Sequence, residues 1–217
     1  MTNRNNFNPG LYLVTDRGLS RGREIETIVE AAVRGGANTV QLREKDAPTD
    51  EFVEIAKSLK TLLGRYGIPL IINDRIDVAL ESGAEGVHIG QSDTGYEEAR
   101  RLLGPERIIG LSVETMEQAL EANDLDVDYI GLSGVFPTST KTDIQSPMGL
   151  EGVKKIKEES RHKLVAIGGI NSSNAADLMR AGADSLAVVS AICSADDPET
   201  EARRIAHIIN GFKQGNH

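Results

Sequence analysis

Two cations and an amide alternate at the end of an apolar run, in the segment VQLREKD. In an extended chain, the side chains of Gln41, Arg43 and Lys45 point to the same side. That face suits a polyanion such as a diphosphate, because Arg and Lys both bind phosphate oxygens. The alternative is a surface charge cluster in which Glu44 and Asp46 pair with the two cations.

Two carboxylates follow the next two apolar runs. Asp74 comes directly after LIIN, and Asp93 follows GVHI within the segment VHIGQSD. Two carboxylates aimed at one point beside a basic cluster suit Mg2+ that bridges a diphosphate. Two other uses stay open: a general acid–base pair, or, for Asp74, an N-cap of the helix that follows. The same segment contains His88 and Gln91, whose roles the sequence does not decide.

Hydroxyl groups crowd around one lysine in GVFPTSTKTD, the segment at residues 134–143. Thr138, Ser139, Thr140 and Lys141 can form a phosphate grip, in which the hydroxyls donate hydrogen bonds and the lysine supplies charge. Because Ser, Thr and Pro are also common in connections, a solvated loop is the alternative.

Eight short apolar runs position these groups. They are rich in Val, Ile and Leu, as is typical of parallel strands covered on both faces. Helix-like segments with apolar residues three and four apart lie between them. The runs are LYLV at 11, TVQL at 39, LIIN at 70, GVHI at 86, IIGL at 108, YIGL at 129, LVAI at 164 and LAVV at 186.

A weak repeat supports this division. Gly-Ala pairs that begin at positions 36, 83 and 182 each end a helix-like segment and lead into an apolar run. Glycine there suits a helix C-terminus that needs a left-handed residue. We therefore predict an α/β fold, a (β/α)8 TIM barrel, with residues 1–217 as one domain whose short termini are prone to disorder.

This fold places an active site at the C-terminal ends of its strands, and a phosphate usually binds after strands seven and eight. Gly168 and Gly169 follow the seventh run, where glycine lets the backbone approach a ligand closely. Val189 and Ser190 end the eighth run, so we expect a monophosphate there. Ser112 ends the fifth run; its alternative role is an N-cap, for which Thr115 competes.

Composition limits the partners. The net charge of −9 and the isoelectric point of about 5.0 argue against nucleic acid. Cys193 is the only cysteine, and no apolar run resembles a signal peptide or a membrane span, which together favour the cytoplasm and no membrane partner. The four histidines show no zinc-ligand spacing. The expected partners are small phosphorylated molecules, and self-association into a homo-oligomer stays open.

Nearly the whole chain resembles the thiamine-phosphate synthase family. The motifs that carry the resemblance are LYLVTD, QLREK, NDR, GVHIGQSD, FPTSTK, AIGGI and VVSAI, in the family's order. One departure precedes FPTSTK, where the family usually has Gly-Pro and this chain has Ser133 and Gly134. The greater freedom of Gly134 puts the rigidity of that loop in doubt.

The resemblance implies an enzyme that joins a hydroxymethylpyrimidine diphosphate to a thiazole phosphate, usually its carboxylated form. It releases diphosphate, and CO2 from any carboxylate, by a dissociative route assisted by Mg2+. It implies that the pyrimidine diphosphate is bound by Gln41, Arg43, Lys45, Asn73, Ser112 and Lys141. The implied thiazole phosphate ligands are Thr138, Ser139, Thr140, Gly169, Val189 and Ser190, and the implied metal ligands are Asp74 and Asp93. The alternatives are a thiazole tautomerase, a sensor that binds the precursors without turnover, and another phosphate-binding barrel.

Overall fold

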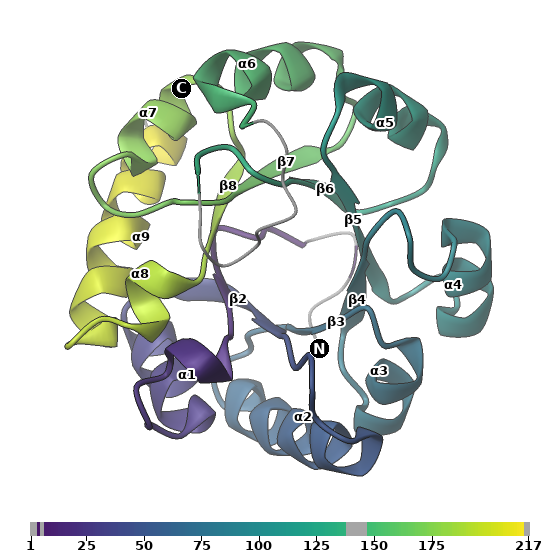
Figure 1. Cartoon of the computed structure of the whole chain (residues 1–217), viewed down its shortest axis with the longest axis vertical. Helices are drawn as coiled ribbons and strands as arrows, with labels where there is room; N and C mark the ends of the chain where they lie inside the picture. The colour runs from purple at the N-terminus through teal and green to yellow at the C-terminus, as the bar shows by residue number, and fades with distance from the viewer. Residues whose placement is uncertain (1–3, 5–6, 138–146, 215–217) are drawn as a thin grey trace.

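Eight parallel strands close into a barrel in the computed structural model, which describes residues 4, 7–137 and 147–214. The strands follow one another around the ring in chain order, and β1 pairs with both β2 and β8 (Figure 1). They are β1 (Leu11–Val14), β2 (Ala37–Leu42), β3 (Leu70–Asn73), β4 (Gly86–Ile89), β5 (Ile108–Val113), β6 (Tyr129–Leu132), β7 (Lys163–Ile167) and β8 (Ser185–Val188). The predicted (β/α)8 barrel is confirmed. The termini predicted to be prone to disorder lie largely outside the described residues.

Helices surround the ring of strands (Figure 1). They are α1 (Ile25–Arg34), α2 (Thr49–Gly64), α3 (Ile76–Ser82), α4 (Tyr96–Leu103), α5 (Met116–Glu121), α6 (Gly149–Glu159), α7 (Ala175–Arg180), α8 (Ser190–Cys193) and α9 (Pro198–Gln214), with short 3-10 turns η2 (Arg17–Leu19) and η3 (Ala122–Asp124). The last helix, α9, packs against α1 and so joins the two ends of the helical ring.

The strands are buried on both faces, which explains why they do not alternate between apolar and polar residues. Outward residues such as Leu11 and Leu13 belong to a large core shared with the helices. Inward residues form a second, smaller core that includes Tyr12, Tyr129 and Val165. The chain thus fills the barrel interior with side chains, and two of the largest are tyrosines.

Left-handed glycines end three of the helical segments, as the Gly-Ala repeat predicts. Gly83 is the C-cap of α3 with φ 72°, and Gly36 and Gly182 have φ 104° and 101°. An L-residue with a side chain adopts such angles only at a cost, whereas glycine does so freely. Each turn then leads directly into the next strand.

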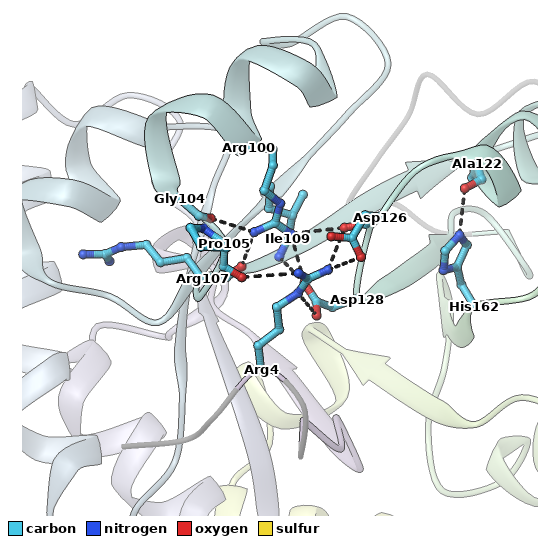
Figure 2. A network of polar contacts seen from close by, with 10 residues as sticks. All are labelled: Arg4, Arg100, Gly104, Pro105, Arg107, Ile109, Ala122, Asp126, Asp128 and His162. Carbon is cyan, nitrogen blue, oxygen red and sulfur yellow. Dashed lines mark hydrogen bonds and ion pairs between the residues drawn. The ribbon is translucent and has the colours of Figure 1, made fainter.

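Arg4 contacts the residues that lead into β6, at the N-terminal end of that strand (Figure 2). Arg4 donates from Nε to Asp128 Oδ1 at 2.7 Å and from Nη2 to the backbone oxygen of Asp126 at 2.8 Å. Asp128 Oδ2 in turn accepts from the backbone nitrogen of Ile109 at 2.8 Å. Phe7 is 1% exposed and its ring lies 5.6 Å from that of Tyr129. These contacts place Arg4 and Phe7 at the N-terminal ends of the strands, away from the strand C-termini.

Candidate functional site

A cavity of about 680 Å3 opens at the C-terminal ends of the strands. Every predicted site residue that the structure describes lines it: Gln41, Arg43, Lys45, Asn73, Asp74, Asp93, Ser112, Gly169, Val189 and Ser190. The other predicted ligands, Thr138, Ser139, Thr140 and Lys141, lie outside the described residues. The ligand roles of all these residues stay predictions.

The basic side of the cavity is formed by the end of β2. Gln41, Arg43 and Lys45 line it together, as the alternation predicts. Arg43 Nη1 lies 3.6 Å from Asp16 Oδ2. Glu44 pairs with Arg17 at 3.3 Å, and only 6% of the Glu44 side chain is exposed. In the alternative of a surface charge cluster, Glu44 and Asp46 would pair with Arg43 and Lys45; of these two acids, Glu44 pairs instead with Arg17.

Asp74 has a left-handed backbone, with φ 63°. This conformation is uncommon for residues other than glycine, although Asp tolerates it better than most. The Asp74 carboxylate accepts a hydrogen bond from Asn73 Nδ2 at 2.5 Å, and its backbone nitrogen donates to His88 O at 2.8 Å. The residue at the N-cap of α3 is Arg75, so Asp74 does not take the alternative role of helix cap.

Asp74 and Asp93 bring their carboxyl groups together from the ends of β3 and β4. Burial, followed by the hydrogen-bonded and like-charged Asp93, raises the pKa of Asp74 to about 6, against the opposing effects of Asn73 and Arg43. Asp93 is oriented by the backbone nitrogen of Gly90, which donates to Asp93 Oδ2 at 2.7 Å. A proton or a cation is needed to hold two carboxyl groups so close.

The donor set at this point fits Mg2+. Within the described residues, no group of three or more His, Cys, Asp or Glu side chains is arranged to hold a metal ion. Two carboxylates alone suit Mg2+, which keeps several waters and takes its remaining oxygens from substrate phosphates. A zinc or calcium site, by contrast, draws more ligands from the protein.

The floor of the cavity is a chain of hydrogen bonds that crosses the barrel. Gln41 Nε2 donates to the hydroxyl of Tyr12 at 2.9 Å, and the hydroxyls of Tyr12 and Tyr129 lie 2.8 Å apart. His88 Nδ1 lies 3.0 Å from the Tyr129 hydroxyl, and His88 Nε2 lies 2.8 Å from Ser112 Oγ. The five side chains come from five different strands, so the chain links one wall of the cavity to the other.

Ser112 points into this chain and does not cap a helix. Thr115 takes that place, because its hydroxyl accepts from Gln118 N at 3.2 Å at the start of α5. His88, whose role the sequence did not decide, lies in the middle of the site. Tyr12 and Tyr129 are additional site residues that sequence reasoning missed. The available signal was a tyrosine at an inward position of each strand.

The glycine-rich side of the cavity lies at the ends of β7 and β8. A Cβ on Gly169 (φ 63°) would lie 2.7 Å from Pro137 O, and one on Gly168 (φ 114°) would lie 3.0 Å from Gly134 Cα. These glycines were expected to admit a ligand, but the close approach that the structure describes is to the loop after β6. Val135 N donates to Ile167 O at 3.1 Å and holds that loop there.

The other residues expected at this end lie at the start of α8. Val189 is the N-cap residue and Ser190 begins the helix. Their backbone nitrogens therefore lie at the helix N-terminus, where N–H donors have no partner within the helix. The two ends of the cavity thus differ in chemistry: cations and carboxylates on one side, backbone and small residues on the other.

Comparison with known proteins gives one family. The family model described as thiamine monophosphate synthase matches residues 11–192. A thiamine-phosphate synthase from Albidiferax ferrireducens is 53% identical over 200 residues, covering 92% of this chain and 91% of that protein. A thiamine-phosphate synthase from Chloroflexus aurantiacus is 48% identical over 200 residues, covering 92% of each. The solved structure of a thiamine phosphate pyrophosphorylase from Pyrococcus furiosus is 40% identical with a TM-score of 0.88, covering 96% of this chain and 98% of that one.

Proposed function

This chain belongs to the thiamine monophosphate synthase family, and from that premise we propose how its cavity carries out the family's reaction. The activity is that of a thiamine-phosphate synthase, a transferase that makes thiamine phosphate. One observation supports the proposed division of the site: Arg43, Lys45, Asp74 and Asp93 line one side of a cavity whose other side contains Gly169 and Ser190. The first set suits a diphosphate and the second a monophosphate.

The diphosphate of the pyrimidine substrate binds beside Arg43 and Lys45 in this proposal, with Asn73 and Lys141 as further donors. Asp74 and Asp93 hold Mg2+, which when bound neutralises negative charge on the leaving diphosphate. The thiazole phosphate lies at Gly169, Val189 and Ser190 and is gripped by Thr138, Ser139 and Thr140.

The work of the protein is positioning and charge neutralisation. A dissociative reaction breaks the bond between the pyrimidine methylene carbon and the diphosphate oxygen before the thiazole nitrogen attacks that carbon. When the thiazole is carboxylated, its carboxyl group then leaves as CO2. Arg43 and Lys45 stabilise the negative charge that develops on the leaving oxygens. The cavity holds the two substrates in line, which removes much of the entropic cost of bringing them together. No protein nucleophile is required.

The test is a diphosphate-release assay on the purified protein with the pyrimidine diphosphate, the carboxylated thiazole phosphate and Mg2+. We expect release that requires all three components, with thiamine phosphate as the product. Omission of each substrate and addition of EDTA are the controls. Release that is unchanged by EDTA would overturn the metal assignment, and absence of thiamine phosphate would overturn the activity.

The alternatives are less well supported. A thiazole tautomerase or a binding protein without turnover is not favoured, because relatives at about 50% identity are thiamine-phosphate synthases. Among the described residues no helix is long and apolar enough to cross a membrane. A cytoplasmic location and self-association are parts of the proposal that cell fractionation and light scattering can test.

A further inference from the structure

The hydrogen-bond chain under the cavity has one consistent direction. Tyr12 and Tyr129 are 1% and 0% exposed, and burial raises the pKa of both phenols well above the usual value. Each therefore keeps one hydroxyl hydrogen. A buried hydroxyl hydrogen without an acceptor is costly, so each of the two must be placed on a neighbour.

The Gln41 end decides where these hydrogens go. Gln41 Nε2 donates to the Tyr12 oxygen, so the Tyr12 hydrogen points away from Gln41 and toward the Tyr129 oxygen at 2.8 Å. The Tyr129 hydrogen then points to His88 Nδ1 at 3.0 Å. Within the part of the chain that the structure describes, neither hydroxyl has another acceptor at hydrogen-bond distance.

His88 is thereby fixed in one tautomer. Its Nδ1 accepts from Tyr129, so its hydrogen lies on Nε2, which donates to Ser112 Oγ at 2.8 Å. A doubly protonated imidazole would reverse the bond to Tyr129 and leave the hydrogen of one of the two buried phenols without an acceptor. The neutral ring is the form that satisfies every group in the chain.

We infer that Tyr12, Tyr129 and His88 form a relay, by which we mean a chain of hydrogen bonds that all run in one donor-to-acceptor direction. This relay sets which polar groups Gln41 and Ser112 present to the ligand. The Gln41 amide nitrogen is committed to Tyr12, so its carbonyl oxygen faces the cavity as an acceptor. The Ser112 oxygen is committed to His88, so its hydroxyl hydrogen is available as a donor. This inference rests on the proposed function for the identity of the ligand, although the relay itself does not.

The relay makes Gln41 and Ser112 selective for one arrangement of ligand groups. An exocyclic amino group of an aminopyrimidine donates to the Gln41 carbonyl oxygen. An oxo group at the same position is itself an acceptor, so it could form no hydrogen bond with that oxygen. A polar group that meets no partner in a buried site costs about 1–3 kcal/mol. Tyr12, Tyr129 and His88 are thus positioning residues for recognition of the amino heterocycle.

Two glycines make room for the relay. A Cβ on Gly110 would lie 2.1 Å from Cζ of Tyr129, and a Cβ on Gly131 would lie 2.8 Å from Cε1 of His88. The rings of His88 and Tyr129 are stacked with centroids 5.4 Å apart. The neighbouring strands therefore admit these two rings in this position only because they carry no side chain there.

The first test measures the position of the His88 hydrogen by long-range 1H–15N correlation spectroscopy at pH 8, with a His88→Gln variant to identify the signal. We expect hydrogen on Nε2 in the unaltered protein. Gln41→Glu places a carboxylate, which only accepts, next to Tyr12. Every hydrogen bond in the relay should then reverse, and the hydrogen should move to Nδ1 of His88.

The matched control breaks the link without removing a ring. In a Tyr12→Phe background, Gln41→Glu should have no further effect on His88, because the relay no longer connects them. Hydrogen on Nδ1 in the unaltered protein, or a His88 signal that ignores Gln41→Glu, would overturn the relay. Movement of the hydrogen in a protein that makes no thiamine phosphate would support the relay and reject only the proposed function.

The second test measures selectivity. The ratio of kcat/KM for the aminopyrimidine diphosphate to that for its oxo analogue should fall about tenfold or more in Tyr12→Phe, because the Gln41 amide is then free to rotate. Gln118→Ala is the control, since Gln118 lines the same cavity but bonds to the backbone of Glu114. An unchanged ratio in Tyr12→Phe, with the fold intact by circular dichroism, would contradict the inference.

Discussion

At the scale of single residues, the closest test of the site is the carboxylate pair. Asp93→Ala should lower turnover by about 10²–10³-fold, the usual loss when one group that stabilises developing charge is removed. The fold should be unaffected, because Asp93 is exposed at the rim of the cavity. Steady-state diphosphate release checks the loss.

A matched carboxylate elsewhere controls for charge. The side chain of Asp196 is 91% exposed and pairs with Arg21 at the surface. Asp196→Ala should keep a turnover close to that of the unaltered protein. A similar loss in both variants would show that net charge, rather than the pair at the cavity, is responsible.

The sequence predicted the polar residues of the site better than the aromatic ones. Gln41, Arg43 and Lys45 stand out because charged and amide groups break an apolar run at alternate positions. Tyr12 and Tyr129 do not stand out, since a tyrosine within such a run is usually a core residue. Their hydroxyls meet only after the barrel closes, because they lie 117 residues apart in the chain.

At the scale of elements, the loop after β6 contains Gly134, at a position where the family resemblance leads us to expect proline. Gly134 has φ 68°, and proline is restricted to about −65°. Gly134→Pro, which introduces the family's usual residue, should therefore lower the free energy of unfolding by more than about 1 kcal/mol. Urea unfolding followed by circular dichroism measures the change.

Ser133→Gly is the companion variant, since it introduces the family's other residue next to Gly134. Ser133 does not have a positive φ. Glycine at this position should therefore lower the free energy of unfolding only by the small entropic penalty of a more flexible unfolded chain. Equal stability of the Gly134→Pro variant and the unaltered protein would mean that this backbone angle is not held.

The elements themselves were predictable because each apolar run is short and bounded by glycine or a polar segment. β1, β3, β4 and β6 begin and end where the runs do, whereas β8 begins one residue earlier and ends before Val189. What the glycines after β7 approach was not predictable. These glycines contact the loop after β6 only because the loops that follow β6 and β7 pack together in the folded barrel, although they are apart in the sequence.

At the scale of the whole molecule, Arg4 ties the start of the chain to the connection before β6 (Figure 2). Arg4→Ala removes its charged hydrogen bonds to Asp126 and Asp128 and should lower the free energy of unfolding by about 1.5–3 kcal/mol. The slope of the urea dependence should be unchanged, because the same surface becomes exposed on unfolding.

Asp128→Ala should be more harmful than Arg4→Ala. Asp128 accepts from Arg4 and from the backbone of Ile109 and lies 3.5 Å from Arg100, and only 8% of its side chain is exposed. Its removal leaves buried donors without an acceptor. The reverse order of stabilities would show that the N-terminal segment, rather than Asp128, organises this face. The sequence did not predict the cluster, since Arg4 and Asp128 are 124 residues apart.

Cys193 gives a pH-dependent prediction. Burial raises the pKa of its thiol to about 11, and Sγ lies 3.7 Å from Val14 O. Because the thiolate is the reactive form, the native protein at pH 8 should react with iodoacetamide far more slowly than the urea-unfolded chain. The native rate should rise toward pH 11. Equal rates for the native and unfolded protein would contradict this burial.

The contact between Cys193 and Val14 also makes Cys193 a probe of whether the barrel opens between β1 and β8. Val14 ends β1, and Cys193 lies in the short helix that follows β8, so the thiol lies beside the seam where the first strand meets the last. No other cysteine competes for a label. The rate at which Cys193 is labelled would therefore measure how often β1 and β8 separate. Comparison of that rate with the rate of global unfolding would distinguish local opening of the barrel from unfolding of the whole chain.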